Sequence, residues 1–234
     1  RVLTFDCYGT LIDWESGILA GLAPLTAQLA QPKTRDEILE THAYYESTQQ
    51  RQTPAKNYQQ LLAIVYRRIA EEWNIKVDWQ ECVHYGQSVK QWNAFDDSAE
   101  ALRYLKQYFK LVILSNVDND SFAASNEKLG IKFDAIYTAE DIGSYKPAAA
   151  NFDYMLTALE RLGIEKSTVL HTAESMFHDH LPANQHGLKS CWIYRRHEKE
   201  GFGATMQPKQ MPQYDFCYTS MAEMVEAHKD CLRG

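Results

Sequence analysis

The sequence predicts an α/β fold: a Rossmann-like parallel sheet as the core, with a helical cap domain inserted into it. Short apolar runs rich in β-branched or aromatic residues alternate with segments of helical periodicity, which is typical of three-layer α/β proteins. About a hundred residues separate the first run from the second, far more than a crossover between parallel strands needs. A chain of 234 residues, 45% of them apolar, is long enough for one such domain with an insertion.

Buried strands are predicted where short apolar runs are followed by polar or small residues. Four such runs occupy residues 2–5, 111–114, 168–171 and 190–194, and weaker runs at 135–137 and 215–218 would extend the sheet. Helices are predicted over 99–108, 121–129 and 151–162, where apolar residues recur at spacings of three and four, and over 221–232. Gly130 and Gly163 stand where the C-terminal caps of two of these helices are expected.

The residues between the first two strands are predicted to form four amphipathic helices, at 18–29, 35–50, 57–73 and 78–92. Pro32, Pro54 and a turn at 74–76 separate these helices. We therefore predict a helical cap domain over residues 15–95 and a catalytic core formed by residues 1–14 and 96–234. The cap domain is expected to stand over the C-terminal edge of the sheet, where open α/β sheets bind their ligands.

Charge and cysteine content restrict the partners that we expect. The chain has 24 basic and 31 acidic side chains, a formal charge of −7 and no basic run, which argues against nucleic-acid or membrane binding. Its five cysteines are odd in number and lack CxxC spacing, so no disulfide framework is predicted. No apolar run approaches the roughly 18 residues of a membrane helix, and no signal peptide is recognisable. We expect a cytoplasmic protein with a small-molecule partner; the sequence leaves open whether it forms a homodimer.

Polar residues that follow the predicted strands point to one site at the sheet edge. Asp6 follows the first strand, Lys146 comes after a later one, and Asp179 lies in a polar segment after the next. A carboxylate with a pKa near 4 is ionised at neutral pH, so Asp6 can act as a nucleophile if a cation keeps it charged. Lys146 would supply that cation, Thr10 would orient Asp6, and Asp179 would hold Lys146 or position the hydrolytic water.

Four short motifs occur in order along the chain. They are Asp6-Cys7-Tyr8-Gly9-Thr10, Leu114-Ser115-Asn116, Tyr145-Lys146-Pro147 and Ala173-Glu174-Ser175-Met176-Phe177-His178-Asp179. This order resembles the haloacid dehalogenase superfamily, in particular its type II 2-haloacid dehalogenases, over nearly the whole chain. The resemblance implies a hydrolase that forms an ester on Asp6 and needs no cofactor.

Tyr8 indicates the class of reaction. The phosphatases that the chain resembles carry a second Asp at this position, which protonates the leaving alcohol, whereas a phenol with a pKa near 10 is a poor proton shuttle. A halide leaving group needs no proton. The sequence therefore predicts hydrolytic dehalogenation of a small 2-haloalkanoic acid, a halogenated carboxylic acid, through an aspartyl-ester intermediate.

Four side chains are expected to contact the substrate. Ser115 and Asn116 would donate hydrogen bonds to its carboxylate, and Tyr8 and Trp14 would line an apolar part of the pocket. The halide contact stays unassigned. The type II enzymes that the chain resembles have an arginine on an early cap helix, and the matching positions here hold no arginine.

Two other functions stay open on the sequence. Glu174 could join Asp6 and Asp179 in an octahedral Mg²⁺ site, which would indicate a Mg²⁺-dependent phosphatase of the same superfamily. The altered fourth motif would also suit a catalytically drifted binding protein. The nearby histidines lack the spacing of a zinc site, and His178 and Asp179 are predicted to open a helix with His180 exposed.

Overall fold

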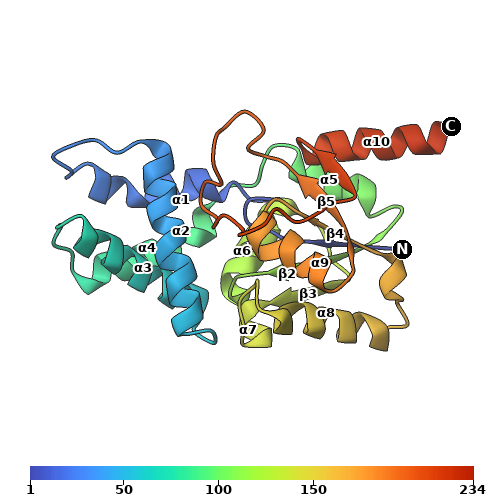
Figure 1. Cartoon of the computed structure of the whole chain (residues 1–234), viewed down its shortest axis with the longest axis horizontal. Coiled ribbons are helices and arrows are strands. Elements are labelled where there is room, and N and C mark those ends of the chain that lie inside the picture. The colour runs from blue at the N-terminus through green and yellow to red at the C-terminus, as the bar shows by residue number, and fades with distance from the viewer.

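The computed structural model describes all 234 residues and contains one six-stranded parallel sheet (Figure 1). The strands are β1 (Val2–Phe5), β2 (Lys110–Ser115), β3 (Ala135–Thr138), β4 (Val169–Ala173), β5 (Lys189–Ile193) and β6 (Phe216–Tyr218). Their order across the sheet is β3-β2-β1-β4-β5-β6, and every neighbouring pair is parallel. The prediction of a Rossmann-like α/β core is confirmed, with strand ends shifted by at most two residues.

Helices cover both faces of this sheet. On one face lie α5 (Ser98–Leu105), α6 (Asn119–Leu129) and α10 (Met221–Arg233), and on the other lie α8 (Ala149–Arg161) and α9 (Leu181–Gln185). Because alternate side chains of a strand point to opposite faces, Leu3 and Phe5 pack with the first group and Val2 packs with the second. The short helical segments are α7 (Ala139–Ile142), η2 (Lys166–Thr168) and the π-helical turn η3 (Met176–His180).

Four helices and a turn between β1 and α5 stand beside the sheet, at the left of Figure 1. We call α1 (Trp14–Thr26), α2 (Arg35–Gln52), α3 (Tyr58–Glu72), α4 (Trp79–Gln87) and η1 (Ser88–Gln91) the cap helices. The predicted start of α1 at residue 18 is wrong by four residues, because the Asp13 carboxylate accepts a hydrogen bond from the Ser16 N–H at 3.2 Å and caps the helix earlier.

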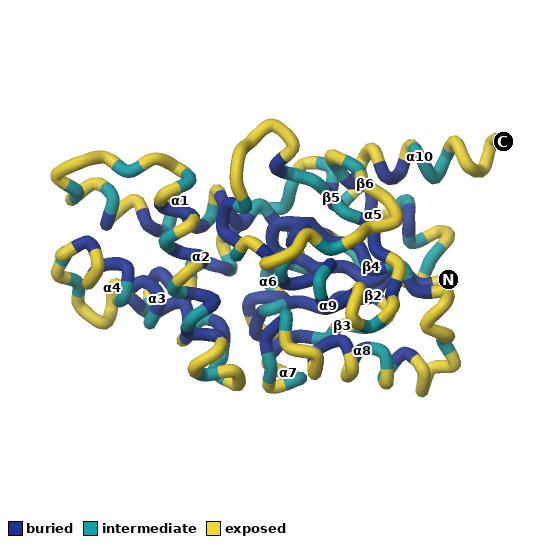
Figure 2. Tube along the Cα trace, in the orientation of Figure 1, coloured by how far each residue is buried: buried dark blue, intermediate teal, exposed yellow.

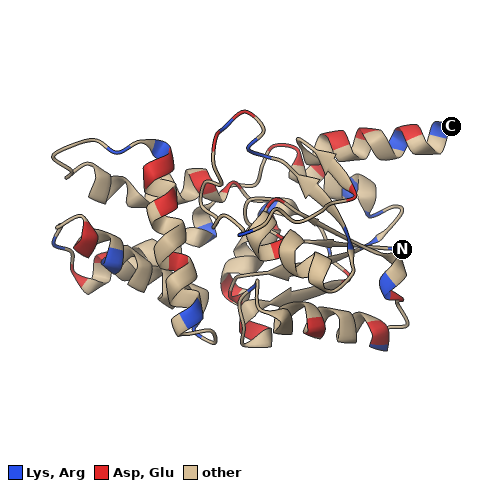
Figure 3. Cartoon of the chain, in the orientation of Figure 1, with Lys and Arg blue, Asp and Glu red and all other residues tan.

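One hydrophobic core runs from the sheet into the cap helices. A cluster of 42 buried residues joins Phe5 and Leu111 of the sheet to Leu22, Leu61 and Leu62 of the cap helices. Figure 2 shows buried segments continuing across both parts, and Figure 3 shows acidic and basic side chains interspersed over the elements. None of the helices has the length and apolar character that crossing a membrane requires.

Candidate active site

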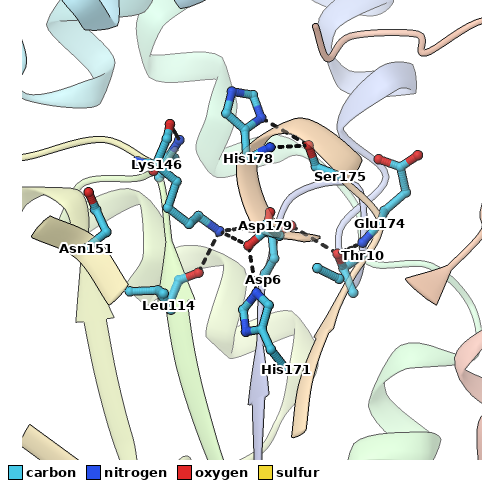
Figure 4. Close-up of polar contacts among 12 residues, drawn as sticks. Asp6, Thr10, Leu114, Lys146, Asn151, His171, Glu174, Ser175, His178 and Asp179 are labelled. Carbon is cyan, nitrogen blue, oxygen red and sulfur yellow. Dashed lines mark hydrogen bonds and ion pairs between the residues drawn. The ribbon is translucent and has the colours of Figure 1, made fainter. Parts of the chain in front are cut away.

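A lysine between two aspartates forms the centre of the site (Figure 4). Asp6 follows β1, Asp179 lies in the η3 turn after β4, and Lys146 precedes α8. The Lys146 Nζ donates to Asp6 Oδ1 at 2.9 Å, to Asp179 Oδ1 at 2.6 Å and to the Leu114 carbonyl oxygen at 2.8 Å. These three acceptors use all three hydrogens of the ammonium group, so its position is fixed.

Burial and pairing set the charges of this centre. Asp6, Lys146 and Asp179 are each at most 5% exposed. Burial raises the pKa of Asp6, and the adjacent ammonium opposes that shift. Although burial alone would lower it, the two carboxylates raise the pKa of Lys146, so the lysine stays charged at neutral pH. Against the effect of burial, Lys146 and His171 hold the pKa of Asp179 well below its usual range.

Thr10 fixes the orientation of the candidate nucleophile. Its Oγ1 donates to Asp6 Oδ2 at 3.0 Å and accepts from the Glu174 N–H at 2.9 Å. The turn between Asp6 and Thr10 depends on Gly9, whose φ of +93° is favourable only for glycine, and a Cβ there would lie 2.9 Å from the Trp14 Nε1. Each oxygen of Asp6 therefore has its own donor.

Asp179 is held from below by a buried histidine. The His171 Nε2 lies 2.9 Å from Asp179 Oδ1, and the His171 Nδ1 lies 2.8 Å from the Thr4 Oγ1. The second oxygen, Asp179 Oδ2, is buried and has no hydrogen-bond partner. Asp179 is thus oriented through one oxygen, and its other oxygen stays available to a molecule in the site.

A cavity of about 20 Å³ lies between this centre and the cap helices. The residues that line it are Asp6, Tyr8, Trp14, Glu46, Gln50, Tyr58, Ser115, Asn116, Lys146, Ser175, His178 and Asp179. We call Asp6, Lys146 and Asp179 the floor of the cavity, and Glu46, Gln50 and Tyr58, from the cap helices, its ceiling. This volume holds about one water molecule, so a larger ligand requires the cavity to open.

Seven of the eight predicted site residues line the cavity, and Thr10 lies behind Asp6. The Tyr8 hydroxyl lies 2.9 Å from the Ser125 Oγ on α6, away from Asp6. Burial raises the pKa of Tyr8 well above its usual value, which keeps the phenol protonated. Tyr8 therefore contributes its ring and no proton shuttle to the cavity.

Ser115 and Asn116, at the end of β2, differ in which of their side-chain polar atoms have a hydrogen-bond partner. The Ser115 Oγ is buried without a partner. The Asn116 Oδ1 accepts from the Lys146 N–H at 2.7 Å, and its Nδ2 donates to the Lys146 carbonyl at 2.9 Å. Asn116 thus fixes the segment that carries Lys146 and keeps one N–H for a ligand.

Sequence reasoning missed the ceiling and two residues after β4, Ser175 and His178. Glu46 accepts hydrogen bonds from the Tyr58 hydroxyl at 2.8 Å and from the Gln50 Nε2 at 3.3 Å, and burial raises its pKa to about 7. Its nearest basic group, His42, is neutral because burial lowers its pKa to about 3. A sequence signal was present for Ser175 and His178, which both stand in the fourth motif, and His178 directly precedes Asp179.

The three carboxylates of the alternative Mg²⁺ site do not converge. Figure 4 shows Glu174 pointing away from the Lys146 ammonium, which lies between Asp6 and Asp179. No group of three His, Cys, Asp or Glu side chains in the chain is arranged to hold a metal ion. Burial raises the pKa of Glu174 to about 8, so this residue is largely protonated at neutral pH.

The positions of His180 and of the arginines bear on two expectations from the sequence. The prediction that His180 is exposed is wrong: the π-helical turn carries it inward, where its Nε2 lies 3.0 Å from the Ala173 carbonyl and its Nδ1 lies 2.9 Å from the Ser190 Oγ. No arginine lines the cavity. Arg35, at the start of α2, pairs with Glu15 at 3.0 Å, and neither residue lines the cavity.

With this geometry in place, the comparisons identify the family. Residues 1–172 match the model of the haloacid dehalogenase-like hydrolases, and the chain belongs to this family. No curated protein matches the sequence. Among solved structures, an L-2-haloacid dehalogenase is 22% identical, with 98% of this chain and 99% of that chain covered and a TM-score of 0.75.

Two further structures resemble the chain along its length. The L-2-haloacid dehalogenase of Xanthobacter autotrophicus with chloropropionic acid covalently bound is 18% identical, with 98% of each chain covered and a TM-score of 0.76. The putative HAD-hydrolase YfnB of Bacillus subtilis, bound to magnesium, is 17% identical, with the same coverage and a TM-score of 0.73. At these identities the likeness shows a shared fold.

Proposed function

We propose that this protein hydrolyses the carbon–halogen bond of a small 2-haloalkanoic acid through an aspartyl ester on Asp6. The observation that carries the proposal is an oriented carboxylate paired with Lys146 at 2.9 Å, while the residue two positions later, Tyr8, holds its hydroxyl against α6. A structural relative that carries covalently bound chloropropionic acid supports the same chemistry.

In the first step an oxygen of Asp6 attacks the carbon that bears the halogen. A carbon–oxygen bond forms, the carbon–halogen bond breaks, and the halide leaves with the electron pair. Lys146 keeps Asp6 ionised in a site that excludes nearly all water, which increases the reactivity of the carboxylate. No proton is transferred, so the engaged phenol of Tyr8 does not impede this step.

In the second step water attacks the carbonyl carbon of the Asp6 ester. The substrate departs as a 2-hydroxy acid with its ester oxygen, which takes one proton of the water. Asp6 keeps the oxygen of the water, and the second proton is released to solvent, so that Asp6 is again a carboxylate. Asp179 Oδ2, which has no partner, accepts a hydrogen bond from the water and orients it. The Lys146 ammonium stabilises the negative charge that develops on the carbonyl oxygen.

The substrate carboxylate is assigned to the end of β2. The Ser115 hydroxyl and the remaining N–H of Asn116 are uncommitted donors in the cavity wall. Since the cavity has room for about one water molecule, substrate entry requires the cap helices to move away from the sheet. The YfnB structure, which is described as revealing interdomain movement, supports such a motion in this fold.

The test is a single turnover of 2-chloropropionate in heavy-oxygen water with enzyme in excess. We expect stoichiometric chloride release and one heavy oxygen in the peptide that contains Asp6, detected by mass spectrometry. Asp6→Asn should release no halide. Product formed with no label on Asp6 would exclude the aspartyl-ester route.

A panel of chloro-, bromo- and fluoro-acids, assayed with and without chelator, separates this function from the Mg²⁺-dependent phosphatase. We propose that no cofactor is needed, so halide release should be insensitive to chelator. Chelator-sensitive release of phosphate from an aryl phosphate, with no halide release, would favour the phosphatase. If the wild type shows neither activity, and Asp6→Asn leaves every measurable phenotype and ligand affinity intact, a binding protein would be favoured.

A further inference from the structure

We propose that His178 is a further catalytic residue, which donates a hydrogen bond from its Nε2 to the halide as it leaves the substrate carbon. This inference rests on the proposed function and supplies the halide contact that the motifs leave unassigned. It starts from an unexplained atom: the Nε2 of His178 is buried in a residue that lines the cavity, and it has no hydrogen-bond partner. An unpaired buried polar atom costs about 1–3 kcal/mol, so its retention calls for a ligand.

The hydroxyl groups around the other ring nitrogen determine where the proton lies. The His178 Nδ1 lies 3.2 Å from the Ser175 Oγ and 3.3 Å from the Thr205 Oγ1, and these two oxygens are 2.9 Å apart. If one hydroxyl donates to the other, the second has its proton free to donate to Nδ1. This arrangement uses both hydroxyl protons, makes Nδ1 an acceptor and places the imidazole hydrogen on Nε2.

The ring is held firmly in this orientation. The His178 backbone N–H donates to the Ser175 Oγ at 3.0 Å, so Ser175 contacts both the backbone and the ring of His178. Thr205 approaches from the loop after β5 and is itself buried. A ring held from two segments of chain can present its Nε2 to the cavity without losing side-chain entropy on binding.

His178 is neutral when it donates. Burial lowers its pKa to about 4, while Asp179 raises it and Lys146 lowers it. A neutral N–H in a nearly dry cavity is a strong donor to a charge that develops during the reaction, and it does not bind the neutral carbon–halogen bond equally well beforehand.

Three other donor residues of the cavity, Lys146, Ser115 and Asn116, have partners or assignments of their own. Lys146 is saturated by three acceptors, and Ser115 and Asn116 are assigned to the substrate carboxylate. Figure 4 shows the His178 ring apart from both Asp6 and the Lys146 ammonium, and His178 and Asp6 line the same cavity. In a displacement at carbon the leaving group departs opposite the attacking oxygen. A donor that lines the cavity but stands apart from Asp6, as the Nε2 of His178 does, can therefore receive the halide.

The step balances without any transfer of a proton. The bond between Asp6 and carbon forms, the carbon–halogen bond breaks, and the halogen takes the electron pair and accepts a hydrogen bond from Nε2–H. The imidazole keeps its hydrogen throughout. The same geometry would serve a general base only if Nε2 carried a lone pair, and in that case His178 would act on the water of the second step.

Substitution by leucine and by glutamine distinguishes these roles. Glutamine keeps an N–H donor of similar reach and cannot act as a base at neutral pH. We expect His178→Leu to slow the single-turnover release of chloride on the order of a hundredfold, with a larger loss for fluoride, and His178→Gln to recover at least tenfold of it. His197→Gln, a change at a half-exposed histidine outside the cavity, should match the wild type.

Accumulation of the ester on Asp6 distinguishes the results that would contradict this role of His178. Rapid release of one equivalent of halide by both His178 variants, with the ester accumulating on the Asp6 peptide, would assign His178 to the water and overturn the proposal. Unchanged rates in folded His178→Leu would overturn it as well. Wild-type protein that releases no halide from any acid would instead refute the proposed function.

Halide binding to the resting enzyme gives a test that needs no turnover. Trp14 lines the same cavity, so bromide or iodide bound there should quench its fluorescence. We expect saturable quenching in wild type and in His178→Gln, at least tenfold weaker binding in His178→Leu, and no saturable phase in Trp14→Phe. Equal affinity in wild type and His178→Leu would contradict a halide contact at Nε2.

Discussion

On the floor of the cavity, which the sheet provides, Lys146 lies 2.9 Å from Asp6 and 2.6 Å from Asp179. On the ceiling, which the cap helices provide, Glu46 is equally buried but has only the neutral donors Tyr58 and Gln50. The floor keeps its charges by pairing them. The ceiling avoids an unpaired charge by keeping a proton, because burial raises the pKa of Glu46 to about 7.

The floor and the ceiling therefore respond differently to pH. A paired floor has the same charge over the whole neutral range, which suits a nucleophile that must stay ionised. An unpaired ceiling changes its charge close to pH 7 and would add a negative charge facing an anionic substrate. We therefore expect substitutions on the floor to act through chemistry and stability together, and substitutions on the ceiling to act through pH.

The largest effect is expected for Lys146→Met. Removal of the ammonium leaves two buried carboxylates without a cation, which should cost about 3–5 kcal/mol of unfolding free energy. Halide release should fall at least about a thousandfold, because Asp6 loses the charge that keeps it ionised. Urea unfolding and the single-turnover assay measure both effects, with the exposed Lys166→Met as the control.

The stability loss in Lys146→Met should depend on pH. The two carboxylates can take up protons below their pKa values, so the loss should be smaller at pH 5 than at pH 8. A loss that is equal at both values would show that the lysine contributes packing alone and would remove the contrast between floor and ceiling.

The floor could be predicted from the sequence and the ceiling could not, for a physical reason. Parallel strands end at one edge, so Asp6 and Lys146 converge once the strands are recognised. Glu46 reaches the cavity only through the way α2 docks on the sheet, which its own periodicity does not specify. His178 was missed because it was expected only to open a helix with Asp179, whereas residues 176–180 form a π-helical turn and His178 lines the cavity.

The next largest effect is expected where the two parts are joined. Arg196, which is 4% exposed, donates to Glu15 at 2.5 Å and to Asp36 at 2.9 Å, and thereby ties the loop after β5 to α1 and α2. Arg196→Met should cost about 3 kcal/mol, because Glu15 stays buried with weaker partners. It should also raise the KM for the halogenated acid more than it lowers kcat, since closure of the cap helices becomes less favourable.

Unfolding in urea and steady-state kinetics test this second prediction. Arg35→Met is the matched control, because Arg35 also pairs with Glu15 at 3.0 Å but its side chain is 41% exposed. It should cost less than about 1 kcal/mol. Equal losses in the two variants would mean that burial of Arg196 does not matter to the junction.

A smaller effect, with a sign that depends on pH, is expected for Glu46→Gln. The folded pKa of Glu46, about 7, lies above the unfolded value of 4.5, so the folded state binds the proton more tightly. Its contribution to stability is complete below pH 4.5 and is lost as the pH rises through 7. Glu46→Gln should therefore be more stable than the wild type at pH 8, on the order of 2 kcal/mol, and about equal to it at pH 4.5.

The pH dependence of activity should follow the ionisation of Glu46. In the wild type, kcat/KM for an anionic acid should fall as Glu46 ionises above pH 7, and Glu46→Gln should flatten that limb of the profile. Glu71→Gln, an exposed change on α3, should keep the wild-type profile. A profile unchanged by Glu46→Gln would show that another group controls the pH dependence, and Glu174, with a pKa of about 8, would be the next to test.

The smallest effect is expected for Arg67→Ala, and it isolates what burial contributes. The Arg67 Nε lies 2.9 Å from the Glu71 Oε1, the same distance as Lys146 Nζ to Asp6 Oδ1, but these side chains are 46% and 61% exposed. Water screens the exposed pair, so its loss should cost about 0.3–0.5 kcal/mol and less at high salt. Since the two distances are equal, a loss comparable to that of Lys146→Met would mean that pairing distance, rather than exclusion of water, sets the strength of an ion pair in this protein.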